Sequence, residues 1–108
     1  MSLRGSNTNV GTSNSEVVAA PTTPRALNIL SVTFTNTDLV PHTIILKDAT
    51  TERFRYLVPP GSSSVKFDAD TYGLTGWRLA AAASLNATTA SAPGSASTVR
   101  VEAEYGRV

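Results

Sequence analysis

The segment NILSVTFTN, residues 28–36, decides the fold class of this chain. Its apolar residues Leu30, Val32 and Phe34 alternate with serine and threonine at the positions between them. Successive side chains of a β-strand point to opposite faces, so this alternation predicts a strand with one face in a core and one outside it.

Short segments of similar character follow along the chain. Alternation or a short apolar run predicts further strands over residues 39–47, 52–58, 64–68, 77–83 and 98–105. The turn residues 36–38 predict a hairpin between the first two strands. Residues 69–76 and the small-residue stretch NATTASAPGSAS, 86–97, are expected to be loops.

The segment from Trp77 to Ala83 is ambiguous, because its run of alanines favours a helix while its spacing also fits a strand. We expect a strand, since a helix of so few residues would be marginal. With six to seven short strands, the sequence predicts an all-β fold, a small antiparallel β-sandwich or barrel with an extended N-terminal arm.

The arm comprises residues 1–27, which are mostly small and polar and bury too little to fold on their own. Residues 28–108 would then form the β-sandwich domain. The stretch of the arm expected to bind a partner is Val17, Val18, Ala19 and Ala20. A tail without a binding role is equally compatible with this composition.

Composition excludes several functional classes. Nine Lys and Arg against eight Asp and Glu give a net charge of +1, and the basic residues are scattered, which argues against nucleic acid as a partner. The chain has no cysteine, no apolar stretch typical of a signal peptide and no apolar run long enough to span a membrane. We therefore expect a single domain made in the cytoplasm, with no membrane partner.

Residues that carry chemistry in enzymes are sparse. His42 is the only histidine, which leaves no second imidazole for a metal site, and we expect it at the surface or in a hairpin. No serine lies in a Gly-x-Ser-x-Gly motif, and no glycine-rich segment opens a helix to hold phosphate. Asp68 and Asp70 could hold calcium, but acids that cap a loop are the favoured interpretation. We expect no enzymatic activity, no catalytic residue, no metal and no cofactor.

Aromatic residues support one alternative function. Trp77, Tyr72 and the loop at residues 68–70 could be the ligand contacts of a carbohydrate-binding module, although a tryptophan at the start of a strand is more often a core anchor. Arg53 and Arg55 share one strand face, and the nearby aromatics fall on the opposite face. This arrangement favours a face turned to solvent or to another subunit over a nucleic-acid surface.

Four segments of the chain resemble small tailed-bacteriophage virion proteins. They are VTFTNTDLVPHTIILKD (32–48), YLVPPGSSSVKFD (56–68), WRLAAAASL (77–85) and VRVEAEY (99–105). In that group a strand with Asn-Thr-Asp leads through His-Thr into a second strand, and a proline-containing turn follows. The resemblance implies a β-sandwich structural component of a phage particle, without active-site residues.

The resemblance and the arm together suggest a role in assembly. We expect a non-enzymatic bacteriophage virion structural protein, foremost a capsid decoration or stabilising protein that forms a homo-oligomer through its β-domain. Its arm would dock on the major capsid protein or another virion protein, and its location would be the virion. The alternatives are a neck, tail or fibre component of the virion, or a carbohydrate-binding β-module.

Overall fold

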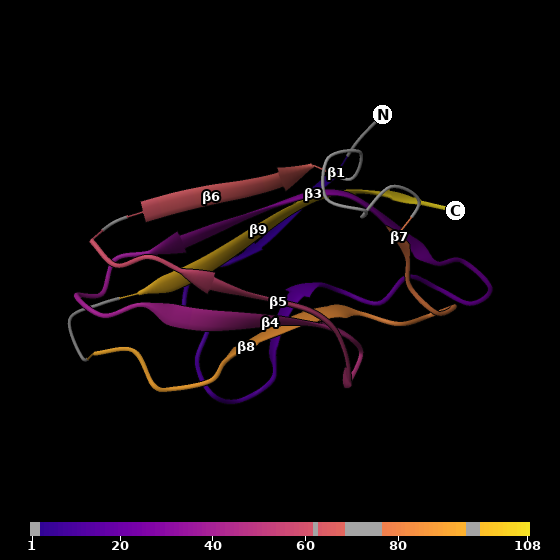
Figure 1. Ribbon diagram of the computed structural model, residues 1–108. Helices are drawn as coiled ribbons and strands as arrows, with labels where there is room; N and C mark the ends of the chain where they lie inside the picture. Colours follow the sequence, from indigo (N-terminus) through magenta and orange to yellow (C-terminus); the bar gives the residue numbers. More distant parts are fainter. Residues whose placement is uncertain (1–2, 62, 69–76, 95–97) are drawn as a thin grey trace.

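The fold is seen in a computed structural model, which describes residues 3–61, 63–68, 77–94 and 98–108. The regular elements in this part of the chain are all β-strands (Figure 1). They are β1 (Leu3–Asn7), β2 (Ser15–Val18), β3 (Leu27–Asn36), β4 (His42–Asp48), β5 (Thr51–Val58), β6 (Ser63–Asp68), β7 (Trp77–Arg78), β8 (Leu85–Thr89) and β9 (Val99–Arg107).

The strands form two antiparallel sheets that pack face to face (Figure 1). One has the order β1-β9-β3-β6, with β7 also paired to β3, and the other has the order β2-β8-β4-β5. Because β9 runs along one edge of β3 for its whole length, β6 and β7 share the opposite edge and together fill one position. β4 and β5 form a hairpin in one sheet, and β6 and β7 follow one another in the other sheet. All other successive strands alternate between the two sheets, which is the topology of a jelly roll. The expected all-β fold is confirmed.

The core lies between the sheets and draws mainly on β3, β4 and β9. The strands expected over residues 28–36 and 98–105 are confirmed, and the inward side chains of β9 alternate with exposed or half-buried ones. The largest fully buried apolar side chains include Phe34, Leu27, Ile29, Ile44, Leu46 and Leu85.

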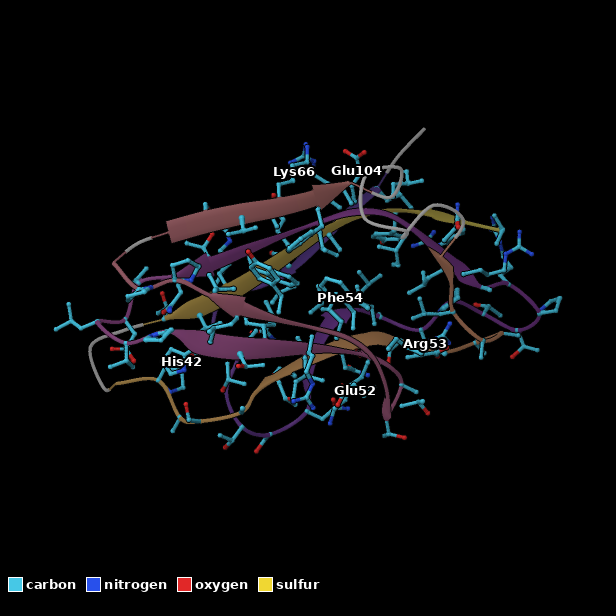
Figure 2. All side chains as sticks on the ribbon, in the orientation of Figure 1. His42, Glu52, Arg53, Phe54, Lys66 and Glu104 are labelled. Atoms are coloured by element: carbon cyan, nitrogen blue, oxygen red, sulfur yellow. The ribbon has the colours of Figure 1, made fainter. Side chains whose placement is uncertain are left out.

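Aromatic side chains join the two sheets along the side where β5 and β6 are the edge strands. The ring of Phe67 in β6 lies 5.3 Å from that of Phe54 and 4.7 Å from that of Tyr56, both in β5. Phe34 is 5.7 Å from Phe67 on its core side. Figure 2 shows Phe54 between the sheets. Edge-to-face contacts of this kind add to the burial energy and hold two edges that share no ladder.

The expected N-terminal arm is not confirmed, because both strands within residues 1–27 belong to the sandwich. β1 pairs with β9 in one sheet, and β2 pairs with β8 in the other. Val10, Val17 and Val18 are buried in the core. Both strands lie at sheet edges, where one side of each strand has no ladder partner, so they can form with few large apolar residues.

Two details of β3 differ from the prediction. Leu30 is 36% exposed, because a bulge between Ile29 and Ser31 shifts the alternation. Ile29 takes the core position instead, and Ser31 lies on the outer face of the sheet beside Thr33 and Glu102. The expected hairpin between residues 28–36 and 39–47 is wrong. β3 and β4 lie in different sheets, and the turn at residues 36–38 starts a crossing between them.

The chain after residue 76 departs furthest from the prediction. The strand expected over 77–83 ends after two residues, and Ala82 adopts a positive φ of 58° in the turn that follows. The stretch 86–97, expected to be a loop, instead begins within β8, whose residues are all buried between β2 and β4. Small side chains suit this central position but carry no strong apolar pattern. The loop expected at 69–76 lies outside the described residues.

The two ends of the sandwich differ. Leu3 of β1 pairs with Tyr105 of β9, so both chain termini lie at one end, called here the terminal end (Figure 1). At the opposite end, Asn36 pairs with Val99 and with Ser63. We call this the crossover end, because the connections that follow β3, β5 and β8 pass between the sheets there.

Gly5 tests whether β1 is part of the sandwich. A Cβ at this position would lie 2.6 Å from the carbonyl oxygen of Val17 and 2.8 Å from Cγ2 of Val18. We expect Gly5→Ala to lower the free energy of unfolding by about 1–3 kcal/mol, because β2 must move to admit the methyl group.

The matched control is Gly106→Ala in β9, where an added Cβ would meet no heavy atom of the described residues within 4 Å. It should change stability by less than about 0.5 kcal/mol. Urea denaturation measures both values. Equal, small effects of the two substitutions would mean that residues 3–7 are a detached arm.

Candidate functional site

Polar side chains gather at the crossover end, where the connections that follow β3, β5 and β8 leave their sheets. Backbone groups that leave a ladder need other hydrogen-bond partners if they are buried. Asn36, Asp38 and His42 supply these partners, and we refer to them as the crossover network. All three residues are buried or nearly so.

Asp38 is the centre of the crossover network. Its Oδ2 accepts hydrogen bonds from the His42 Nε2 at 2.7 Å and from the Gly94 backbone N–H at 2.9 Å, and its Oδ1 accepts one from the Leu39 N–H at 2.7 Å. These donors, the His42 ring first, lower the pKa of Asp38 from 3.8 to about 2. The carboxylate therefore stays ionised at any physiological pH and links β4 to the connections after β3 and β8.

Asn36 extends the crossover network to the connection after β5. Its Nδ2 donates to the carbonyl oxygens of Val40 at 2.9 Å and of Val58 and Pro59 at 3.3 Å each. Its Oδ1 accepts the Asp38 N–H at 2.9 Å. One amide group thus holds the connection after β3 beside the end of β5.

His42 is fully buried, so the expectation of a surface or hairpin histidine is wrong. Figure 2 shows it at the start of β4. Its Nδ1 lies 3.4 Å from Oγ of Ser91, which puts an aspartate, a histidine and a serine in series. The contact is longer than the roughly 2.6–3.2 Å of an activated serine, and the nearby Gly94 N–H already donates to Asp38 and not to an oxyanion site. The series fits a structural role.

Exposed apolar side chains lie on the segments that the crossover network holds. Leu39 is 87% exposed, Val40 52% and Leu57 56%, and we refer to these three residues as the end patch. The backbone of Val40 lies beside that of Val58 through their shared partner Asn36. Exposed apolar side chains on a backbone held by hydrogen bonds are candidates for a contact with another protein.

The predicted partner-binding stretch is divided by the structure. Val17 and Val18 are 4% exposed and pack within the core of their own chain. Ala19 and Ala20 are exposed. A binding role for this stretch stays a prediction, and only its second half presents side chains to a partner in this conformation.

The basic residues of β5 are paired locally. Arg53 contacts Asp48 at 3.1 Å, and Arg55 contacts Glu52 at 2.7 Å. On the other sheet, Glu102 is paired with Arg4 and Arg100. Figure 2 shows Arg53 on one sheet and Lys66 on the other, so these two basic side chains do not lie side by side on one sheet face.

The described residues include no group of three or more His, Cys, Asp or Glu side chains placed to hold a metal ion. Nor does this part of the chain contain a helix that could cross a membrane. The residues considered for calcium or carbohydrate give no test, because Asp70, Tyr72 and the side chains of Asp68 and Trp77 lie outside the description.

Comparisons with known proteins bear on the fold. No family model and no curated protein matches the chain. Among solved structures, a chain of the "Cyanophage Pam1 capsid asymmetric unit" is similar, with a TM-score of 0.55 and 18% sequence identity. The similarity covers 97% of this chain and 82% of that chain. At this identity the likeness concerns the fold, and it includes the strands formed by residues 1–27.

The crossover network makes stability depend on pH in a defined window. Because folding lowers the pKa of Asp38 from 3.8 to about 2, its contribution to stability is complete above pH 3.8 and is lost as the pH falls towards 2. We expect Asp38→Asn to have a lower urea midpoint than the wild type at pH 7, and the difference to shrink between those two pH values.

Glu52→Gln is the matched control, since Glu52 forms its ion pair with Arg55 at an exposed site. Its urea midpoint should stay close to that of the wild type at pH 7. The assigned role of the carboxylate would be contradicted if the urea midpoints of the wild type and Asp38→Asn differed by the same amount at pH 7 and at pH 2.

Proposed function

We propose that this protein is a non-enzymatic structural component of a bacteriophage virion, in the role of a capsid decoration or stabilising protein. The observation that carries the proposal is the likeness in fold to a chain of a cyanophage capsid, which spans 97% of this chain. Jelly rolls are recurrent building blocks of viral capsids, although a fold alone does not determine function. The resemblance of its strand and turn motifs to phage virion proteins supports the same role.

The end patch supplies the contact for assembly in this proposal. Burial of an apolar side chain contributes about 1.5–3 kcal/mol, so Leu39, Val40 and Leu57 together could anchor a protein contact. The crossover network fixes the backbone that carries them, which reduces the entropy lost on binding. The partner would be another virion protein, such as the major capsid protein, or a second copy of this chain.

The end patch replaces the N-terminal arm as the main docking element of the proposal. Val17 and Val18 already contribute to the core, so releasing them to bind a partner would cost the energy of their burial. Ala19 and Ala20 remain as a minor contact. A neck, tail or fibre position in the particle fits the same features equally well.

The double variant Leu39→Glu, Val40→Glu tests the proposed contact. Both side chains are exposed, so we expect an unchanged circular dichroism spectrum and unfolding midpoint. Copies of the protein in purified phage particles, counted by quantitative mass spectrometry, should fall about tenfold or more, because two charges would be buried at the contact.

Leu30→Glu is the control, since Leu30 is an exposed apolar residue outside the end patch. Its copy number should match that of the wild type. If the wild-type protein is absent from purified particles, the virion role is wrong. Binding of the wild type to glycans, with loss on substitution of Trp77, would instead favour the carbohydrate-binding alternative.

A further inference from the structure

A hollow of about 290 Å³ lies at the terminal end, where the segment between β2 and β3 passes the end of β9. Its lining residues are Ala20, Pro21, Thr22, Arg25 and Arg107. The backbone around it is held in place: Ala26 and Val108 exchange two hydrogen bonds of 2.9 Å, and the Arg25 N–H donates to the Thr22 carbonyl oxygen at 2.9 Å.

Two arginine residues line this hollow. Nη2 of Arg25 donates to the backbone carbonyl oxygen of Arg107 at 3.4 Å, and both arginine residues are exposed. Within the described residues, neither forms an ion pair, whereas Arg4, Arg53 and Arg55 all do. Two like charges at one hollow favour the binding of an anion, and the planar guanidinium fork suits a carboxylate.

We infer that the Arg25–Arg107 hollow binds a carboxylate side chain from an acidic protein segment. Nucleic acid is the weaker fit, because it is normally bound through several phosphates and stacked aromatic rings, and the lining has two cations and no aromatic residue. Ala20 lines the hollow, and the preceding Ala19 is exposed as well, so the residues on this side of the hollow have small side chains. This site does not depend on the proposed virion role.

The carboxylate has two possible sources. One is a different protein, and the other is a second copy of this chain. Glu16 in the edge strand β2 is exposed and forms no ion pair within the described residues, so it is the group a second copy would offer. Both sources present the same chemistry to the two arginines.

Binding can be tested on the full chain with an acetylated and amidated tetraglutamate peptide at low ionic strength. In NMR spectra of the arginine side chains, we expect saturable shifts of the Arg25 and Arg107 Nε–H signals and no shift of Arg55, which is already paired. The variant Arg25→Gln, Arg107→Gln should bind about tenfold or more weakly, since two charge-assisted contacts are lost. The matched control, Arg53→Gln with Arg55→Gln, should bind like the wild type.

Sedimentation velocity of the protein without peptide distinguishes the sources. Self-association that is lost in both Glu16→Gln and the Arg25, Arg107 variant supports the site with a second copy as the source. A monomer that still binds tetraglutamate supports it with another protein as the source. The inference is overturned if the peptide does not bind saturably, if the control variant weakens binding equally, or if oligothymidylate binds these arginines more tightly than the peptide does.

Discussion

The ionised carboxylate of Asp38 is the constraint on which the crossover end depends. A carboxylate held away from water is strongly unfavourable unless hydrogen-bond donors surround it. The donors here come from His42 in β4, from the residue after Asp38 and from Gly94 far along the chain. Because these donors must stay in position, β4 and the connections after β3 and β8, which could otherwise move independently, are fixed relative to one another.

The regular alternation of apolar and polar residues correctly predicted the central strands of one sheet. β9 and most of β3 combine β-branched or aromatic residues on one face with polar residues on the other, and both lie centrally in the same sheet. β8 is also central, yet its Asn and Thr residues are buried by neighbours that only the tertiary structure provides. The sequence does not predict β1 and β2, because an edge strand can form with few apolar residues. The bulge that exposes Leu30 likewise leaves no signature in the alternation.

Predicting the sites was harder than predicting the strands. Asp38 and His42 are four residues apart, and the turn residues 36–38 predict a hairpin where the chain in fact crosses to the other sheet. Neither the burial nor the pairing of His42 therefore follows from the sequence. Arg25 and Arg107 are separated by most of the sequence and meet because β3 and β9 are neighbours. Contacts of this kind depend on sheet order, which hydrophobic periodicity does not encode. The predicted stretch at Val17 and Val18 was apolar for the ordinary reason that it belongs to the core.

The pairing of Leu3 with Tyr105 gives the molecule a direction. Any polypeptide that continues from either terminus leaves at the terminal end, away from the crossover end. If several copies bound a surface through their end patches, all of their termini would point away from that surface and lie at the same distance from it. The sandwich would then be a spacer, and a polypeptide joined to either terminus would lie above the surface by about the length of the strands.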